Sequence, residues 1–331
     1  EEDFPFFFSF DDVHMERHVS RGHQEQSNVP YSSIGPTPPR ARSRSLGVQV
    51  SMARSSPPRS PPRPQGNNVV HQWLTESALK LLWSSASLVG LRRLNLLLSR
   101  KAYGDTCFFF EGEGVLNTVA LTIDDGLCRH GAKNSMVDAV AGLLREHNAH
   151  ATFFVCSKYL NGLEEEAAHL VADGHELGNH LAEDLNFVYP KLSPDSFDDE
   201  LSKATAAIEA AVPGHNVRWF RAPQGMMTSS MADSVRRQGL RSALGDAYAD
   251  DWAMENNAAF VARTILHQAR SGSVIILHQP EVGYREHTLE ALRLVLEGLS
   301  ERGMRAVTLS ELDALASSGA KKEKGNPTQS Q

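Results

Sequence analysis

The chain has 331 residues, of which 41% are hydrophobic and 22% are charged, and its formal net charge is -7 at pH 7. A chain of this length can hold one large domain or two ordinary ones, and its composition is that of a soluble globular protein. The negative charge argues against a nucleic-acid-binding protein. The three cysteines are too few and too scattered for a disulfide framework or a zinc cluster.

The first 70 residues differ in composition from the rest of the chain. Between Gln26 and Val70 there is no Asp or Glu, whereas six Arg and nine Pro are interspersed with Ser and Gly. Such a sequence buries too little apolar surface to offset its chain entropy. Residues 1–70 are therefore predicted to be a disordered, basic arm, and an Arg/Ser recognition tail stays open as the alternative.

Residues 71–104 are predicted to form an amphipathic helical linker. Glu76 and Lys80 interrupt its apolar sequence, and the uncharged run 81–91 is shorter than the roughly 20 residues that cross a bilayer. Apolar side chains recur on one helical face, which we expect to pack against the following domain. Contact of residues 73–98 with a membrane surface is the alternative that we do not favour.

From residue 117 onward, short apolar runs alternate with longer segments of helical spacing. Seven runs are predicted to be strands, namely 118–124, 151–157, 175–180, 217–223, 240–246, 273–279 and 304–309. A predicted helix follows each of the first six strands, and these helices are 134–148, 164–174, 193–212, 228–239, 257–272 and 286–303. Ser193 before Pro194 marks the start of the third helix.

This alternation predicts the fold class α/β. The strand runs 153–155 and 274–277 are apolar without alternation, as in a parallel sheet that is buried on both faces. Seven strands at roughly 25-residue spacing favour a distorted (β/α)7 barrel over residues 105–316, one unit short of the common eight, with a disordered tail at 317–331. An open doubly wound sheet is the alternative, weakened because no glycine-rich nucleotide loop follows the first strand.

Ionisable residues collect where the predicted strands end. Asp124 and Asp125 end the first strand, and others end or follow four later strands: His180, Arg221, Asp251 and His278. If these ionisable residues were placed at random on the surface, they would not collect at one edge of the barrel. Because parallel barrels hold their active sites at the carboxyl ends of their strands, this rim is the predicted active site.

Five segments at these strand ends carry a resemblance to a known family. In order and spacing, TIDDG, GNHLAED, RAPQG, DAYADDW and IILHQ resemble the five motifs of the polysaccharide deacetylase family, which includes chitin and peptidoglycan deacetylases with a NodB-type domain. The resemblance implies a carbohydrate N-deacetylase whose partner is an N-acetylated glycan and not a nucleic acid. It also implies a secreted or cell-surface protein, although the chain shows no signal peptide.

The resemblance also implies a single divalent metal. Asp125 and His180 match family ligands, and Asp184 stands where the family usually has a second His, with Leu181 in place of Ser or Thr. A spacing of four residues on a helical turn would place His180 and Asp184 on one face. A carboxylate can replace imidazole, so zinc is expected first, and the added oxygen ligand admits cobalt, manganese or magnesium. The alternative is that Asp184 only caps the next segment and the metal site is degraded.

Catalytic roles follow from the same matches. Asp124 resembles the general base, and Arg221 the arginine that pairs with it and keeps it ionised. His278 resembles the general acid, and the negative charge of Asp251 would raise its proton affinity. Structural alternatives stay open, because an Asp pair can form a turn or helix cap and an Arg–carboxylate pair can be structural.

Four further residues are expected to contact substrate. Pro223 shapes its loop, and a backbone N–H near Gln224 would help to stabilise the oxyanion. Aromatic residues are common in the family at the position of Gln224, so the sugar contact differs there. Trp252 and Ile276 are expected to form apolar walls around the acetyl methyl group.

The leading hypothesis is the metal-dependent removal of N-acetyl groups from a glucosamine-containing carbohydrate such as chitin or its oligosaccharides. One alternative keeps the barrel and hydrolyses another, non-polymer amide, with or without metal. A second alternative is a catalytically degenerate barrel that binds glycans through Trp219, Tyr248 and Trp252.

Overall fold

The computed structural model describes residues 105–185, 187–254 and 257–324. The predicted basic arm and helical linker, with the membrane contact considered for 73–98, lie outside the described residues. Within the described part, none of the helices combines the length and the apolar character that crossing a membrane requires.

All seven predicted strands form, although several are shorter than the apolar runs that predicted them. They are β1 (Thr118–Gly126), β2 (Thr152–Val155), β3 (Glu176–Asn179), β4 (Trp219–Phe220), β5 (Arg241–Ser242), β6 (Val274–His278) and β7 (Arg305–Val307). They make one parallel sheet in the order β5-β4-β3-β2-β1-β6, with β7 paired to β1. The central strand β1 is buried along its whole length, which explains its lack of alternation.

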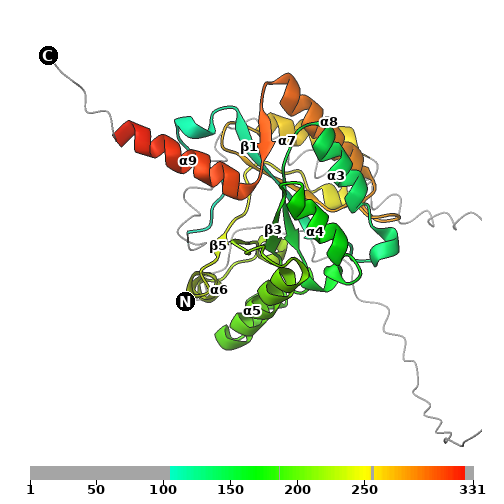
Figure 1. The fold of residues 1–331 in the computed structure, drawn as a ribbon, viewed down its shortest axis with the longest axis vertical. Coiled ribbons are helices and arrows are strands. Elements are labelled where there is room, and N and C mark those ends of the chain that lie inside the picture. Colours follow the sequence, from blue (N-terminus) through cyan, green and yellow to red (C-terminus); the bar gives the residue numbers. More distant parts are fainter. Residues whose placement is uncertain (1–104, 186, 255–256, 325–331) are drawn as a thin grey trace, which may run out of the picture. The chain divides into compact units, whose positions relative to one another are not determined.

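A helix follows each of the first six strands, as predicted, and Figure 1 shows these helices around the sheet. They are α3 (Val137–Glu146), α4 (Glu164–Ala172), α5 (Pro194–Ala211), α6 (Ser229–Arg237), α7 (Ala258–Gln268) and α8 (His287–Glu301). The side chain of Ser193 accepts a hydrogen bond from the backbone N–H of Ser196 and so caps α5 where the Ser–Pro pair predicted its start. Short 3-10 helices, including η1 (Glu113–Val115), η5 (Pro223–Gly225) and η6 (Asp251–Ala253), lie in the connections.

The sheet curls toward closure between β5 and β6, where single bridges replace a regular ladder. Ala247 bridges to Ile275, while the segment before β1 bridges through Cys107 to Ala243. The carboxylate of Asp246 also accepts a hydrogen bond from the backbone N–H of Val274 at 2.9 Å. The distorted (β/α)7 barrel is therefore confirmed, and the open doubly wound sheet is wrong.

The last helix, α9 (Leu309–Lys324), packs at the amino-terminal end of the strands. It extends past residue 317, where the disordered tail was predicted to begin. The indole N–H of Trp219 donates to Ser310 Oγ at 3.0 Å, and Leu309 and Leu312 are buried in the same apolar cluster. Because α9 lies at that end, the carboxyl ends of the strands are left for a functional site.

Candidate active site

Asp124 ends β1 beside the buried guanidinium of Arg221, which follows β4. Arg221 Nη1 lies 2.5 Å from Asp124 Oδ1 and 2.7 Å from Thr122 Oγ1. Arg221 also donates to the backbone carbonyls of Ala243 and Leu244, and its guanidinium lies 4.1 Å from the centroid of the Phe154 ring. The structure thus brings together the predicted base and its predicted arginine, and four hydrogen bonds and the Phe154 ring fix that arginine.

The three predicted metal ligands converge next to this pair. Asp125, His180 and Asp184 each offer a donor atom, and the three atoms lie within 4.8 Å of one another. His180 Nε2 is 3.8 Å from Asp125 Oδ1. Asp125 and His180 are almost fully buried, and the side chain of Asp184 is 20% exposed.

The local backbone that joins His180 to Asp184 differs from the prediction. No helical turn forms after β3; instead Leu181 adopts a left-handed conformation with φ 61° and the loop bends. The side chain of Asn179 holds this turn, because its Oδ1 accepts from Leu181 N at 2.7 Å and its Nδ2 donates to Leu201 O at 3.0 Å. A turn, and not a helix, therefore brings the side chains of His180 and Asp184 together.

Two observations show that this donor set suits a divalent ion. His180 Nδ1 lies 2.8 Å from the carbonyl oxygen of Arg221, so Nδ1 carries the proton and Nε2 presents its lone pair toward Asp125. Asp184 Oδ1 is buried and has no hydrogen-bond partner among the described residues. A buried oxygen of this kind needs a partner, and a cation held with Asp125 and His180 would supply it.

Sequence reasoning missed two arginines at this centre. Arg285, after β6, places Nη1 2.6 Å from Asp125 Oδ2, and Arg129, after β1, places Nη2 3.3 Å from the same oxygen and 3.5 Å from Asp184 Oδ2. Burial would raise the pKa of Asp125, but the charges of Arg285, His278, His180 and Arg129 hold it well below its usual range. For Asp184, burial and the charge of Asp125 raise the pKa.

Sequence reasoning also missed Glu281, which is 1% exposed and fixes the loop after β1. Its carboxylate accepts hydrogen bonds from the backbone N–H groups of Arg129 at 2.8 Å and His130 at 3.0 Å, and it contacts His130 Nδ1 at 2.9 Å. The thiol of Cys128 donates to the same carboxylate, and burial with this neighbour raises the pKa of that thiol to about 12. No motif or spacing marks Glu281 in the sequence.

His278, at the end of β6, pairs with Asp251 as predicted. Its Nδ1 lies 2.7 Å from Asp251 Oδ1, while its backbone N–H donates to Asp251 Oδ2 at 2.8 Å. Burial alone would lower the pKa of His278, but the charge and hydrogen bond of Asp251 outweigh it and raise the pKa to about 9. The pairing thus favours the protonated imidazole, whose side chain is 22% exposed.

The residues expected to contact substrate lie on the same rim. Pro223 and Gln224 form η5, where Gln224 adopts φ 57°. Trp252 follows Asp251 in η6 and is 37% exposed, and Ile276 lies two residues before His278 in β6. Trp219, by contrast, is buried beneath the sheet and bonded to α9, so its predicted glycan contact is wrong.

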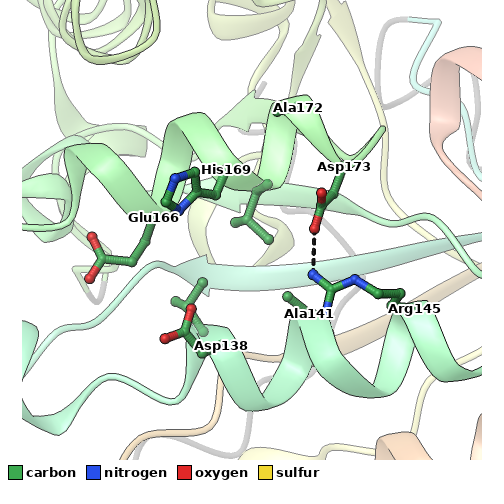
Figure 2. A pocket seen from close by; sticks show the side chains of 9 residues that line it. Asp138, Ala141, Arg145, Glu166, His169, Ala172 and Asp173 are labelled. Atoms are coloured by element: carbon green, nitrogen blue, oxygen red, sulfur yellow. Dashed lines mark hydrogen bonds and ion pairs between the residues drawn. The ribbon is translucent and has the colours of Figure 1, made fainter.

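A separate groove of about 330 Å³ lies on the outer side of the barrel between α3 and α4. Figure 2 shows Asp138, Arg145, Glu166, His169 and Asp173 around it. Arg145 and Asp173 bind each other at 2.6 Å, and none of the five motif segments contributes to the lining. This groove is therefore distinct from the candidate active site.

Similarity to known proteins agrees with the geometry at the rim. A family model for polysaccharide deacetylase matches residues 112–243. The chain is 31% identical over 200 residues to a chitooligosaccharide deacetylase from Azorhizobium caulinodans, covering 56% of this chain and 90% of that protein. It is 28% identical over 197 residues to a peptidoglycan-N-acetylglucosamine deacetylase from Bacillus cereus, covering 59% and 87% of the two chains.

Solved structures share the fold. Peptidoglycan deacetylase PdaC from Bacillus subtilis superposes with a TM-score of 0.56 at 23% identity, covering 64% of this chain and 97% of that one. A CE4 family pseudoenzyme from Bacillus anthracis gives 0.54 at 22% identity, covering 62% and 67%. At these identities the likeness concerns the fold alone. The family model and the sequence match over nine-tenths of a curated relative, together with this fold, show that the chain belongs to the polysaccharide deacetylase family.

Proposed function

We propose that the protein is a metal-dependent hydrolase that removes N-acetyl groups from a glucosamine-containing carbohydrate. The observation that carries this proposal is the arrangement at the rim. A base paired to arginine and an imidazolium paired to carboxylate flank a buried set of three donor atoms. The chitooligosaccharide and peptidoglycan deacetylases that the chain resembles support the carbohydrate class of substrate.

Asp125, His180 and Asp184 would hold the ion. When bound, the ion supplies Lewis-acid activation of water and of the acetyl carbonyl. Zinc is the first expectation, and the two carboxylate ligands also suit cobalt, manganese or magnesium.

Asp124 is the proposed general base. Arg221 binds its Oδ1 inside a buried site, which stabilises the ionised carboxylate and orients it. Oδ2 then takes the proton of the attacking water. Because Arg221 is itself held by Thr122 and two backbone carbonyls, it keeps Asp124 in one orientation through the reaction.

His278 is the proposed general acid. It holds its proton at neutral pH because of Asp251, and Nδ1 is engaged with that carboxylate, so Nε2 is the nitrogen that donates to the leaving amine. Asp251 then stabilises the position of the ring through a second bond to the backbone N–H of His278.

The loop at Gln224 offers the proposed donor to the oxyanion. In η5, the backbone N–H groups of Gly225 and Met226 donate to Ala222 and Pro223, while the N–H of Gln224 has no such bond among the described residues. A preorganised N–H of this kind stabilises the charge that develops on the acetyl oxygen. Trp252 and Ile276 would enclose the methyl group.

The decisive experiment measures acetate release from N-acetylglucosamine oligomers by the full chain. The protein is first chelated, and zinc, cobalt, manganese or magnesium is then added. Restored release supports the proposal and identifies the metal. Release that no chelator affects would favour a metal-independent amide hydrolase on the same barrel, and no release from a folded protein under any metal would leave a glycan-binding barrel.

Two substitutions test the assigned roles. Asp124→Asn removes the base and His278→Ala removes the acid, so each is expected to lower turnover by on the order of a hundredfold or more while the fold stays intact. Asp233→Asn and His267→Ala, at exposed positions on α6 and α7, are the matched controls and should leave turnover unchanged. Near-normal activity of either active-site variant would refute its role.

A further inference from the structure

We propose that Arg129 is a built-in counter-ion that competes with the metal ion for the carboxylates of Asp125 and Asp184. This inference rests on the proposed metal site but concerns a residue that no motif of the family pattern includes. Arg129 lies in the loop after β1, four residues beyond Asp125.

The contacts of Arg129 place its charge on two metal ligands at once. Its Nη2 is 3.3 Å from Asp125 Oδ2 and 3.5 Å from Asp184 Oδ2, so one nitrogen bridges both carboxylates. A divalent ion bound by the same carboxylates would stand within a few ångströms of this guanidinium. In a largely buried site, two cations so close repel each other strongly, which weakens metal binding.

Asp184 explains why a counter-ion is needed. A second histidine at this position would be neutral, whereas Asp184 adds a negative charge beside buried Asp125. Two carboxylates that share a site destabilise each other unless a cation lies between them. Arg129 supplies that cation from a different loop, and the pair of Asp184 and Arg129 carries the same net charge as one neutral histidine.

Hydrogen bonds fix the backbone at Arg129, whereas its partly exposed guanidinium is held by long contacts. Glu281 holds the backbone N–H groups of Arg129 and His130. The guanidinium carbon lies 5.6 Å from the ring of Tyr159 and 5.7 Å from that of Tyr284, within range of cation–π attraction. Its side chain is 27% exposed, and its buried Nε has no hydrogen-bond partner among the described residues. Arg129 Nη1 also donates to the hydroxyl of Tyr284 at 3.4 Å, so its contacts with the two carboxylates and with this hydroxyl are all 3.3 Å or longer.

Arg285 shares with Arg129 a contact with the Tyr284 ring and a buried Nε without a hydrogen-bond partner among the described residues, but the two arginines differ in exposure and in their ion pairs. The side chain of Arg285 is only 8% exposed, and it lies 2.6 Å from Asp125. It forms no ion pair with Asp184 among the described residues. We therefore assign Arg285 a fixed role beside Asp125 and assign the displaceable role to Arg129 alone.

The test is a metal titration of the chelated full chain by calorimetry, with Zn²⁺ and with Mn²⁺, comparing wild type with Arg129→Gln. The variant is expected to bind metal on the order of tenfold or more tightly, because the repelling charge is gone. Its melting temperature without metal is expected to fall, because Asp125 and Asp184 then face each other without Arg129. Arg145→Gln, which removes an exposed guanidinium beside Asp173, is the matched control and should change neither value.

Equal or weaker metal affinity in Arg129→Gln overturns the inference, as does the absence of metal binding in both proteins. If this variant does not fold, Arg129→Met and the wild-type protein labelled with nitrogen-15 arginine take its place. In the labelled protein, the Nε–H resonance of Arg129 should shift during the titration while that of Arg145 stays, and a resonance of Arg129 that does not move also overturns it. Acetate release is measured separately. If metal restores release but Arg129→Gln binds metal no more tightly than wild type, only this inference is refuted. If Arg129→Gln binds metal more tightly but no acetate is released, only the proposed activity is refuted.

Discussion

Four residues in the motif segments share a backbone conformation that their side chains disfavour. Asp125, Leu181, Gln224 and Asp250 have φ between 44° and 61°, the left-handed region, and none of them is glycine. Such conformations cost on the order of 1–3 kcal/mol each and persist where the surroundings over-determine them. Asp125 lies next to the last residue of β1, and the other three lie in loops that follow strands. Residue type alone does not reveal this, so the sequence could not predict it.

The pair of His278 and Asp251 predicts the alkaline limit of activity. The acid form of His278 exists below its raised pKa of about 9, so kcat/KM is expected to fall as the pH rises through that value. In Asp251→Asn the negative charge that raises the pKa of His278 is absent, so the alkaline fall in kcat/KM should move to lower pH. A profile of kcat/KM from about pH 5 to about pH 10 checks this. An alkaline limb at the same pH in both proteins would contradict it.

The same pair contributes to stability with a definite sign. The pKa of His278 is raised by folding above its ordinary value of 6.5. The stabilisation is therefore fully present below about pH 6.5 and disappears as the pH rises through about 9. Thermal unfolding at the two ends of this window should show a smaller difference in Asp251→Asn than in the wild type.

At the scale of elements, the sequence predicted the strands but not the loop residues that contact the site. Runs such as 274–277 are apolar throughout, so hydrophobic pattern sufficed for β6 and β1. In contrast, β4 and β5 have only two residues each, because the ladder there gives way to single bridges and side-chain contacts such as Asp246 with Val274. Arg285 and Glu281 come from the loop after β6, where no period or motif marks them, and only tertiary structure brings them to the site.

The packing of η1 against α9 predicts a destabilising substitution. A Cβ on Gly114 would lie 2.0 Å from the backbone oxygen of Leu315. Backbone cannot yield as a flexible side chain does, so Gly114→Ala is expected to destabilise the protein by about 1–3 kcal/mol and lower its melting temperature. Gly142→Ala in α3, where nothing lies within 4 Å, is the matched control and should hold or slightly raise stability. Equal melting temperatures for both variants would contradict the close packing.

At the scale of the whole molecule, the pattern of the sequence predicts the barrel fold. The barrel over residues 105–316 was predictable because strand and helix periods alternate along it and because five motif segments recur at strand ends. What the sequence left open was the donor geometry. The proposed ligand role of Asp184 depends on the turn at Leu181, and the arginine that pairs with Asp184, Arg129, lies 55 residues away in the chain.

We propose that the basic arm adds nothing to the activity of the barrel. We expect the arginines between residues 26 and 70 to be accessible to trypsin, because a sequence so rich in Pro and Arg is predicted to form no core. Limited digestion of the full chain should leave a resistant fragment close to 105–316 that releases acetate at the original rate. Mass spectrometry identifies the fragment. Protection of the arm, or loss of activity with it, would show that the arm has a role.

Arg221 belongs to two networks through different parts of itself. Its guanidinium binds the proposed base Asp124, whereas its backbone carbonyl sets the tautomer of the proposed ligand His180. A change of side chain at 221 is therefore expected to impair proton abstraction by Asp124 while it keeps the peptide group that orients the imidazole of His180. In such a barrel, one substitution can therefore remove hydrolytic activity while the metal site still binds its ion. Inactive descendants of such a barrel would accordingly keep their metal, and metal content alone would not distinguish them from working enzymes.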